Sequence, residues 1–309
     1  MSARTLRIAT RGSPLALVQT ELAAAALRAE APDLELRIVE ITTEGDRDRE
    51  TPLTVLGGRG VFVRGVEEAL LDGRADIAVH SLKDVPTEAV AGLTLGAMLE
   101  RGDPRDAFVG GDGRRLADLP EGARVGTSSR RRATLLNAMR PDINAASIRG
   151  NVETRLEKVA SGEYDGAILA LAGLERLGRA AAATQIFDAM EFLPSPGQGA
   201  VTLQCREDDE ATLALLAAVD HAATRVAVEA ERGVLAELGS GCSLPVGAYA
   251  QIDGELVALR AMLARDEPAE GELPVFGDAS GPIDQAEETG RGLARQLRAA
   301  LGETVPASP

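Results

Sequence analysis

Aromatic side chains are scarce in this chain of 309 residues, at 2% of the total, and tryptophan is absent. Proteins that bind single-stranded nucleic acid usually stack the bases on several aromatic rings. Nucleic acids and anionic membranes also attract basic proteins, whereas the formal net charge here is −15. We therefore expect neither a nucleic-acid nor a membrane partner, and an interior built from aliphatic side chains.

Cysteine and histidine are equally rare, with two of each. Cys205 and Cys242 cannot form a disulfide framework, and no cluster of His and Cys has zinc-site spacing. The sequence has no run of about 18 apolar residues, so we predict no transmembrane helix. Residues 1–11 lack the apolar core of a signal peptide. These absences predict a cytoplasmic protein without a bound metal.

Lysine is the third scarce residue, because all basic residues except Lys83 and Lys158 are Arg. Lys83 and Asp84 directly follow an apolar strand predicted at 77–80, and Pro86 ends the segment. Ligands of open α/β sheets gather at the carboxyl ends of strands, so Asp84 and Lys83 are candidates for chemistry. An Asp before such a turn is also a common cap residue, which leaves a purely structural role open.

Strand and helix patterns alternate along the first 200 residues and predict an α/β fold. Ser13 and Pro14 suit the start of a helix that runs to about Glu30. Joints rich in Pro and Gly at 101–104 and 192–200 mark domain boundaries. We predict domain 1 at 1–99 and 200–220, domain 2 at 100–199, and a small α+β domain 3 at 221–309.

Domain 3 is expected to contain a hairpin of strands 246–252 and 255–263, turning on Asp253-Gly254 as a type I′ turn. A polar segment and a helix at about 283–301 follow. In domain 1, the stretch from Thr42 to Gly60 is rich in charge and glycine and has no sustained periodicity. We interpret it as a mobile lid rather than as an ordinary solvated loop.

Arginines gather where helices begin, above all at Thr127-Ser128-Ser129 followed by three arginines. Cations are normally disfavoured at the positive end of a helix dipole. A bound anion would reverse this, because free N–H groups, hydroxyls and guanidinium groups would converge on it. A solvated basic face is the alternative. The number of such arginines predicts a ligand with several carboxylates or phosphates.

The two cysteines differ in their surroundings. Cys242 lies on a loop of Gly and Ser, where its sulfur could be reactive, although a loop cysteine is more often inert. Cys205 ends an apolar strand and is expected to be a small core residue.

Taken together, six segments in their order resemble the porphobilinogen deaminase (hydroxymethylbilane synthase) family. The resemblance extends from about residue 6 to residue 250. The segments are ATRGSPLA at 9–16, HSLKDVP at 80–86, GTSSRRR at 126–132, RGNV at 149–152, PGQGA at 196–200 and GC at 241–242.

The resemblance implies three domains, the first two built like type 2 periplasmic binding proteins with the active site in the cleft between them. It implies a cytoplasmic, monomeric transferase of porphyrin and haem biosynthesis. This enzyme couples four porphobilinogen molecules into the linear tetrapyrrole hydroxymethylbilane and releases ammonia. Its cofactor is one dipyrromethane, held by a thioether to the cysteine that matches Cys242.

The resemblance also implies the roles of individual residues. Asp84 matches the catalytic carboxylate, with Lys83 beside it, and Thr42–Gly60 matches the lid. Cofactor contacts are implied for Lys83, Thr127, Ser128, Ser129, Arg131, Arg132, Gly150 and Arg155. Substrate contacts are implied for Arg11, Ser13, Gln19, Arg149, Arg155 and Arg176.

The chain departs from the family pattern at Arg59, Arg130 and Ser240, which puts the charge of the pocket and the geometry of the Cys242 loop in doubt. An anion-binding protein of the periplasmic type, without catalysis, is the alternative function. The lack of a signal-peptide pattern and the presence of both Asp84 and Cys242 argue against it.

Overall fold

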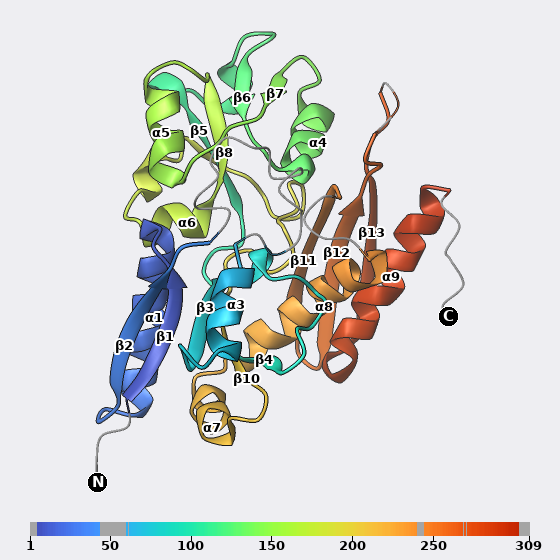
Figure 1. The fold of residues 1–309 in the computed structure, drawn as a ribbon. Helices are drawn as coiled ribbons and strands as arrows, with labels where there is room; N and C mark the ends of the chain where they lie inside the picture. Colours follow the sequence, from blue (N-terminus) through green and yellow to red (C-terminus); the bar gives the residue numbers. More distant parts are fainter. Residues whose placement is uncertain are drawn as a thin grey trace. The chain divides into compact units, whose positions relative to one another are not determined.

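The computed structural model describes residues 5–43, 60, 62–239, 244–267, 269 and 271–302 (Figure 1). The chain divides into two compact units, which we describe separately. The first contains residues 1–102 and 199–225, and the second contains 103–198 and 226–309. Most of the predicted lid, Thr42–Gly60, and the predicted cofactor residue Cys242 lie outside the described residues.

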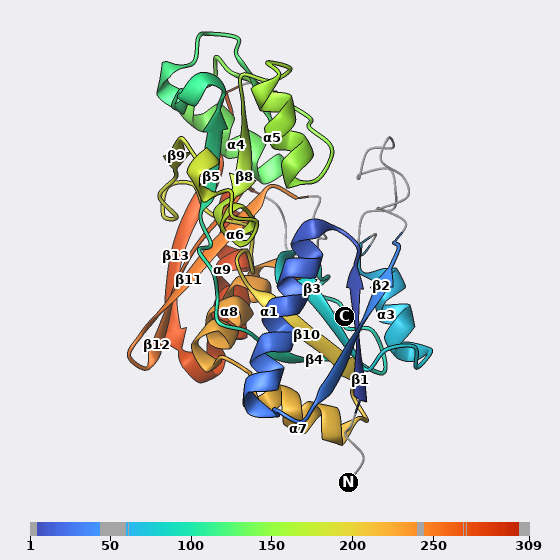
Figure 2. The ribbon, with the colours of Figure 1, turned by 90° about the vertical axis from the view of Figure 1, so that its left-hand side faces the viewer.

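A five-stranded mixed sheet forms the centre of the first unit (Figure 2). Its first three strands in sheet order are parallel, and β10 is antiparallel to both of its neighbours. The strand β10 therefore lies between two strands that precede it by about 100 residues or more. In sheet order the strands are β2 (Glu35–Ile41), β1 (Thr5–Arg11), β3 (Ile77–Ser81), β10 (Val201–Arg206) and β4 (Leu93–Met98).

Helices cover both faces of this sheet because its buried strands are apolar on both sides. In β1, Ile8 packs in the same cluster as α1 (Pro14–Glu30) and α7 (Glu210–Ala218). The next residue, Ala9, packs with α3 (Arg64–Leu71). Helix α1 begins as predicted, with Ser13 as its N-cap. Cys205 is fully buried, as expected.

The second unit contains another five-stranded mixed sheet with helices on both faces. Residues of α4 pack against one face, and residues of α5 and α6 against the other. In sheet order the strands are β7 (Asn144–Ala146), β6 (Arg124–Gly126), β8 (Gly166–Ala170), β5 (Asp106–Gly110) and β9 (Gln185–Ile186). The helices are α4 (Arg130–Met139), α5 (Val152–Ala160) and α6 (Leu171–Arg176).

A three-stranded antiparallel sheet ends the second unit, in the order β11 (Val246–Asp253), β12 (Leu256–Leu263) and β13 (Val275–Pro282). Helices α8 (Ala222–Leu238) and α9 (Ala286–Ala300) share a core cluster with it. The two helices approach closely, since a Cβ at Gly290 would lie 2.0 Å from the carbonyl oxygen of Ala230.

Two expectations about this sheet were wrong. Asp253 pairs with Leu256, so the turn is Gly254-Glu255 rather than Asp253-Gly254. A type I′ turn needs positive φ at both central residues, and Asp112 is the one non-glycine with positive φ among the described residues. The polar segment after β12 also contains a strand, β13, whose residues alternate between half-buried and exposed.

The α/β class is confirmed, with two sheets covered on both faces and a small C-terminal α+β part. The predicted boundaries of the three domains stay a prediction. No single described helix is long and apolar enough to cross a membrane. Helices α7 and α8 reach that length and composition only together, across a bend of 106°. Short 3₁₀ turns lie at Leu82–Asp84, Gly111–Gly113, Leu116–Asp118, Ala180–Ala182 and Ile283–Gln285.

Candidate active site

A cavity of about 70 Å³ in the first unit contains several of the predicted site residues. It lies where β1 and β3 end and α1 begins, which is the edge at which ligands of α/β sheets gather. Its lining residues that matter for the chemistry are Arg11, Ser13, Gln19, His80, Ser81 and Asp84.

The cationic part of the cavity is held in place by local structure. The guanidinium carbon of Arg11, at the end of β1, lies 4.2 Å from the centre of the Phe62 ring, a cation–π arrangement. Ser13 Oγ accepts a hydrogen bond from the backbone N–H of Ala16, which leaves its O–H proton available as a donor. Gln19 is buried, and its Nε2 donates to Ser81 Oγ over 2.8 Å.

The anionic part of the cavity is Asp84, the last residue of the 3₁₀ turn after β3. No hydrogen bond or ion pair joins its carboxylate to another residue in the described part of the chain. The structural alternative, a cap or turn residue, would require such a bond to the nearby backbone. Lys83, half-buried, precedes Asp84 in the same turn but is not among the cavity-lining residues.

His80 is a cavity residue for which the sequence predicted no role. Its Nε2 lies 2.9 Å from Gln204 Oε1, in β10. Burial lowers the pKa of His80 to about 4, and the positive charge of Arg11 acts in the same direction. His80 is therefore neutral at pH 7. Its position in the motif HSLKDVP was the available signal, but its partner lies 124 residues away.

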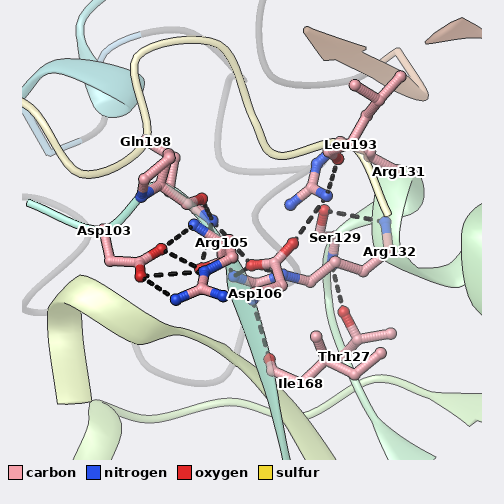
Figure 3. Close-up of polar contacts among 11 residues, drawn as sticks. Asp103, Arg105, Asp106, Thr127, Ser129, Arg131, Arg132, Ile168, Leu193 and Gln198 are labelled. Atoms are coloured by element: carbon pink, nitrogen blue, oxygen red, sulfur yellow. Dashed lines mark hydrogen bonds and ion pairs between the residues drawn. The ribbon is translucent and has the colours of Figure 1, made fainter. Parts of the chain in front are cut away.

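Four of the predicted cofactor residues lie near a buried carboxylate of the second unit, Asp106 (Figure 3): Thr127, Ser129, Arg131 and Arg132. Arg132 donates to Asp106 Oδ1 from Nη2 over 2.6 Å and from Nε over 3.1 Å. Gln198 Nε2 donates to the same oxygen over 2.8 Å. Arg131 Nη1 lies 2.8 Å from Asp106 Oδ2, without hydrogen-bond alignment, and donates to the carbonyl of Leu193.

This cluster has more positive than negative charge. Burial alone would raise the pKa of Asp106, but Arg131 and Arg132 outweigh it and hold that pKa far below its usual range. Burial lowers the pKa of Arg131, and the charge of Arg132 adds to that effect. Two buried guanidinium groups thus share one carboxylate, so Arg131 and Arg132 are partly neutralised before any ligand binds.

The excess positive charge extends to Arg155. Burial lowers its pKa to about 10, and the charges of Arg132 and Arg149 contribute to this. Arg176 ends α6, and burial lowers its pKa as well, against the opposing charge of Glu175. Several arginines that are disfavoured as cations would be stabilised by an anion with more than one negative charge.

The hydroxyls predicted at this site are used by the protein backbone. Thr127 Oγ1 accepts from the N–H of Ser129, and Ser129 Oγ caps α4 by accepting from the N–H of Arg132. Ser128 Oγ donates to the carbonyl of Ile148 over 2.7 Å. They therefore fix the loop that carries the arginines.

The backbone conformation and a close neighbour explain why position 150 is a glycine. Its φ is +105°, and a Cβ at this position would lie 2.6 Å from Thr154 Cγ2, so a larger residue is excluded. Its carbonyl accepts from Arg155 Nε over 3.0 Å. Gly150 thus positions Arg155 within the cationic cluster.

Together these features define the class of the protein: an α/β protein with a carboxylate-bearing cavity in one unit and a cluster of buried arginines around Asp106 in the other. Among the residues that the structure describes, no group of three or more His, Cys, Asp and Glu side chains could hold a metal ion.

Comparison with known proteins gives the family. Residues 6–214 match the family model described as porphobilinogen deaminase, dipyromethane cofactor binding domain, and residues 225–299 match the porphobilinogen deaminase C-terminal domain. A porphobilinogen deaminase of Xanthomonas euvesicatoria pv. vesicatoria (strain 85-10) is 48% identical over 293 residues, which are 95% of each chain. The chain belongs to the porphobilinogen deaminase family.

Partial matches among solved structures include two binding proteins. A periplasmic binding protein of Salmonella typhimurium with high arginine specificity has a TM-score of 0.41 at 14% identity, over 70% of this chain and 92% of its own. A putative methionine-binding lipoprotein of Bacillus subtilis has a TM-score of 0.43 at 13% identity, over 70% of this chain and 90% of its own.

Proposed function

We propose that the cavity around Asp84 is where this porphobilinogen deaminase (hydroxymethylbilane synthase) activates its substrate. The enzyme joins four porphobilinogen molecules into hydroxymethylbilane, with release of ammonia, in tetrapyrrole biosynthesis. The observation that carries the assignment is the Asp84 carboxylate, which lies in the cavity with Arg11 and has no partner among the described side chains.

The charges of the cavity match those of the substrate. Porphobilinogen carries an acetate and a propionate, for which Arg11 is the cationic partner, and the O–H of Ser13 and the amide of Gln19 are donors. Loss of ammonia leaves positive charge delocalised onto the pyrrole nitrogen. A fixed carboxylate stabilises such a charge, and Asp84 supplies it. Lys83, beside Asp84, is assigned to a carboxylate of the cofactor or substrate.

The arginine cluster of the second unit fits the acidic side chains of a dipyrromethane. The fit rests on the positive excess around Asp106 and on the lowered pKa values of Arg131 and Arg155. When bound, this cofactor supplies the nucleophilic pyrrole carbon from which the chain is extended. Arg131, Arg132 and Arg155 hold its carboxylates, and Thr127, Ser128, Ser129 and Gly150 fix the loops that present them.

Arg149, Arg155 and Arg176 are assigned to the carboxylates that accumulate as the product grows. Attachment of the cofactor is assigned to Cys242, and the role of a lid to residues 42–60. We further assign the enzyme to the cytoplasm, as a monomer, with its boundaries between three domains as predicted. The alternative of an anion-binding protein without catalysis is not favoured, because the chain belongs to an enzyme family along nearly its whole length.

The test of the site compares Asp84→Asn with Asp72→Asn, an exposed Asp in the same unit that pairs with Arg74. Loss of one electrostatic contact to a reacting group costs about 3–4 kcal/mol, so Asp84→Asn should consume porphobilinogen about 10²–10³-fold more slowly. Asp72→Asn should match the wild type. Equal rates for all three proteins would remove Asp84 from the mechanism.

The test of the cofactor is the intact mass of the purified protein. The wild type should be heavier than its polypeptide by one dipyrromethane, and Cys242→Ser should lack this adduct. An adduct that persists in Cys242→Ser would place the attachment at another residue.

A further inference from the structure

His80 forms the inner end of a short chain of buried polar groups in the first unit. Gln204 Nε2 donates to Glu67 Oε1 over 3.1 Å, and Gln204 Oε1 lies 2.9 Å from His80 Nε2. All three residues are buried. Glu67 comes from α3, His80 from β3 and Gln204 from β10, so three separate elements fix the chain.

The direction of these hydrogen bonds follows from what each group can donate. A carboxylate only accepts, so Gln204 turns its NH₂ group to Glu67 and its carbonyl to His80. A carbonyl also only accepts, so the hydrogen of the neutral imidazole is on Nε2. Glu67 thereby determines the tautomer of a histidine that it does not touch.

The other ring nitrogen is then a lone-pair acceptor. His80 lines the cavity, and its Nδ1 has no hydrogen-bond partner among the described residues. Nδ1 is therefore the ring atom that remains for a contact in the cavity that His80 and Asp84 both line.

We propose that His80, locked as the Nε2–H tautomer through Gln204 by Glu67, presents Nδ1 as a neutral hydrogen-bond acceptor to an N–H group of the substrate. The identity of that N–H, on porphobilinogen, rests on the proposed function. Glu67 and Gln204 act as positioning residues, since they reach the substrate only through His80.

A neutral acceptor serves this cavity better than a base. The low pKa of His80 makes it a weak proton acceptor at pH 7, but it also keeps the ring uncharged beside Arg11 and beside a cationic intermediate. Asp84 would supply the negative charge, and His80 would fix the direction of an N–H without adding repulsion.

The experiment uses the holoenzyme labelled with ¹⁵N in its histidine rings. The chain has only two histidines, so the spectrum contains two rings, and His221→Gln assigns them. Without substrate at pH 7, His80 should be protonated at Nε2 and unprotonated at Nδ1. A hydrogen on Nδ1, with or without one on Nε2, would overturn the inference.

The matched variants are Glu67→Gln and Glu68→Gln, the same change at a buried and at an exposed position of α3. The new amide in Glu67→Gln can accept or donate, so His80 should show both tautomers. Its kcat/KM for porphobilinogen should then fall about 10-fold, which is the effect of one hydrogen bond. Glu68→Gln should leave both measurements unchanged.

The possible results distinguish the substrate contact of His80, the relay through Gln204 and the proposed function. A mixed tautomer with unchanged kcat/KM would overturn the contact of Nδ1 with substrate. A reduced kcat/KM with the tautomer unchanged would overturn the relay through Gln204. A wild-type holoenzyme that consumes no porphobilinogen would instead overturn the proposed function, and the tautomer would still be measured independently of it.

Discussion

Removing the charge of Asp106 is expected to destabilise the second unit strongly. In Asp106→Asn, one amide oxygen can still accept from Arg132, whose Nη2 lies 2.6 Å from Oδ1 in the wild type. The amide nitrogen would face Arg131, at the position where Oδ2 lies 2.8 Å from Nη1. Two buried guanidinium groups would then lack a counter-charge. Breaking a buried ion pair in this way costs about 3–5 kcal/mol of unfolding free energy.

Tyrosine fluorescence during urea unfolding measures this change selectively. The chain has no Trp, and its two tyrosines, Tyr164 and Tyr249, both belong to the second unit. The control is Asp278→Asn, which removes an exposed partner of Arg260 in the same unit and should cost about 1 kcal/mol or less. If Asp106→Asn loses no more stability than Asp278→Asn, the buried charge pairing is wrong.

The pH dependence of the same measurement gives a second check. The pKa of Asp106 is lowered in the folded protein, whereas an unfolded Asp has a pKa of about 3.9. The stabilisation is therefore complete above the unfolded pKa and is lost as the pH falls toward the folded pKa. The stability difference between wild type and Asp106→Asn should be constant from pH 7 to about pH 5 and shrink below about pH 4.

Three further predictions concern packing, capping and reactivity. Gly290→Ala should lower the unfolding free energy by about 1–3 kcal/mol, because its Cβ would lie 2.0 Å from the carbonyl oxygen of Ala230. Gly292→Ala, whose nearest neighbour is 3.8 Å away, should instead stabilise α9 by about 0.5–1 kcal/mol in the same urea titration. Asn151→Ala removes the side chain that caps α5 and should cost about 1 kcal/mol, and an unchanged urea midpoint would contradict this. Burial raises the pKa of the Cys205 thiol to about 11. In Cys242→Ser, where Cys205 is the remaining cysteine, iodoacetamide at pH 8 should therefore alkylate this thiol only after unfolding. Intact mass measures the alkylation.

Local signals in the sequence predicted the elements that carry the site. Ser13 with Pro14 and the three hydroxyls before α4 mark helix starts that the structure confirms. A different signal predicted β3. Because this strand is buried on both faces, it appears in the sequence as an apolar run at 77–80. By contrast, β13 was missed, since an edge strand with glycines and exposed polar residues resembles a loop.

The partners of the site residues could not be predicted in this way. Arg131 and Arg132 pointed to an anion, but nothing in the sequence shows that Asp106, about 25 residues earlier, already occupies them. Gln198 reaches the same carboxylate from a distance of 92 residues along the chain. Such contacts depend on the order of strands in the sheet, which periodicity and capping do not specify.

The position of β10 in the first sheet has a consequence for how the protein is made. In that sheet β4 has one neighbour, β10, and roughly 100 residues separate the two strands in the chain. At about 5–20 residues per second, the ribosome needs about 5–20 s to synthesise this stretch. During that time the first sheet cannot close, and β5 to β9 of the second unit are synthesised within the same interval. Until β10 is synthesised, the nascent chain therefore leaves unpaired the edges of β3 and β4 that β10 covers in the folded sheet, and unpaired strand edges favour aggregation.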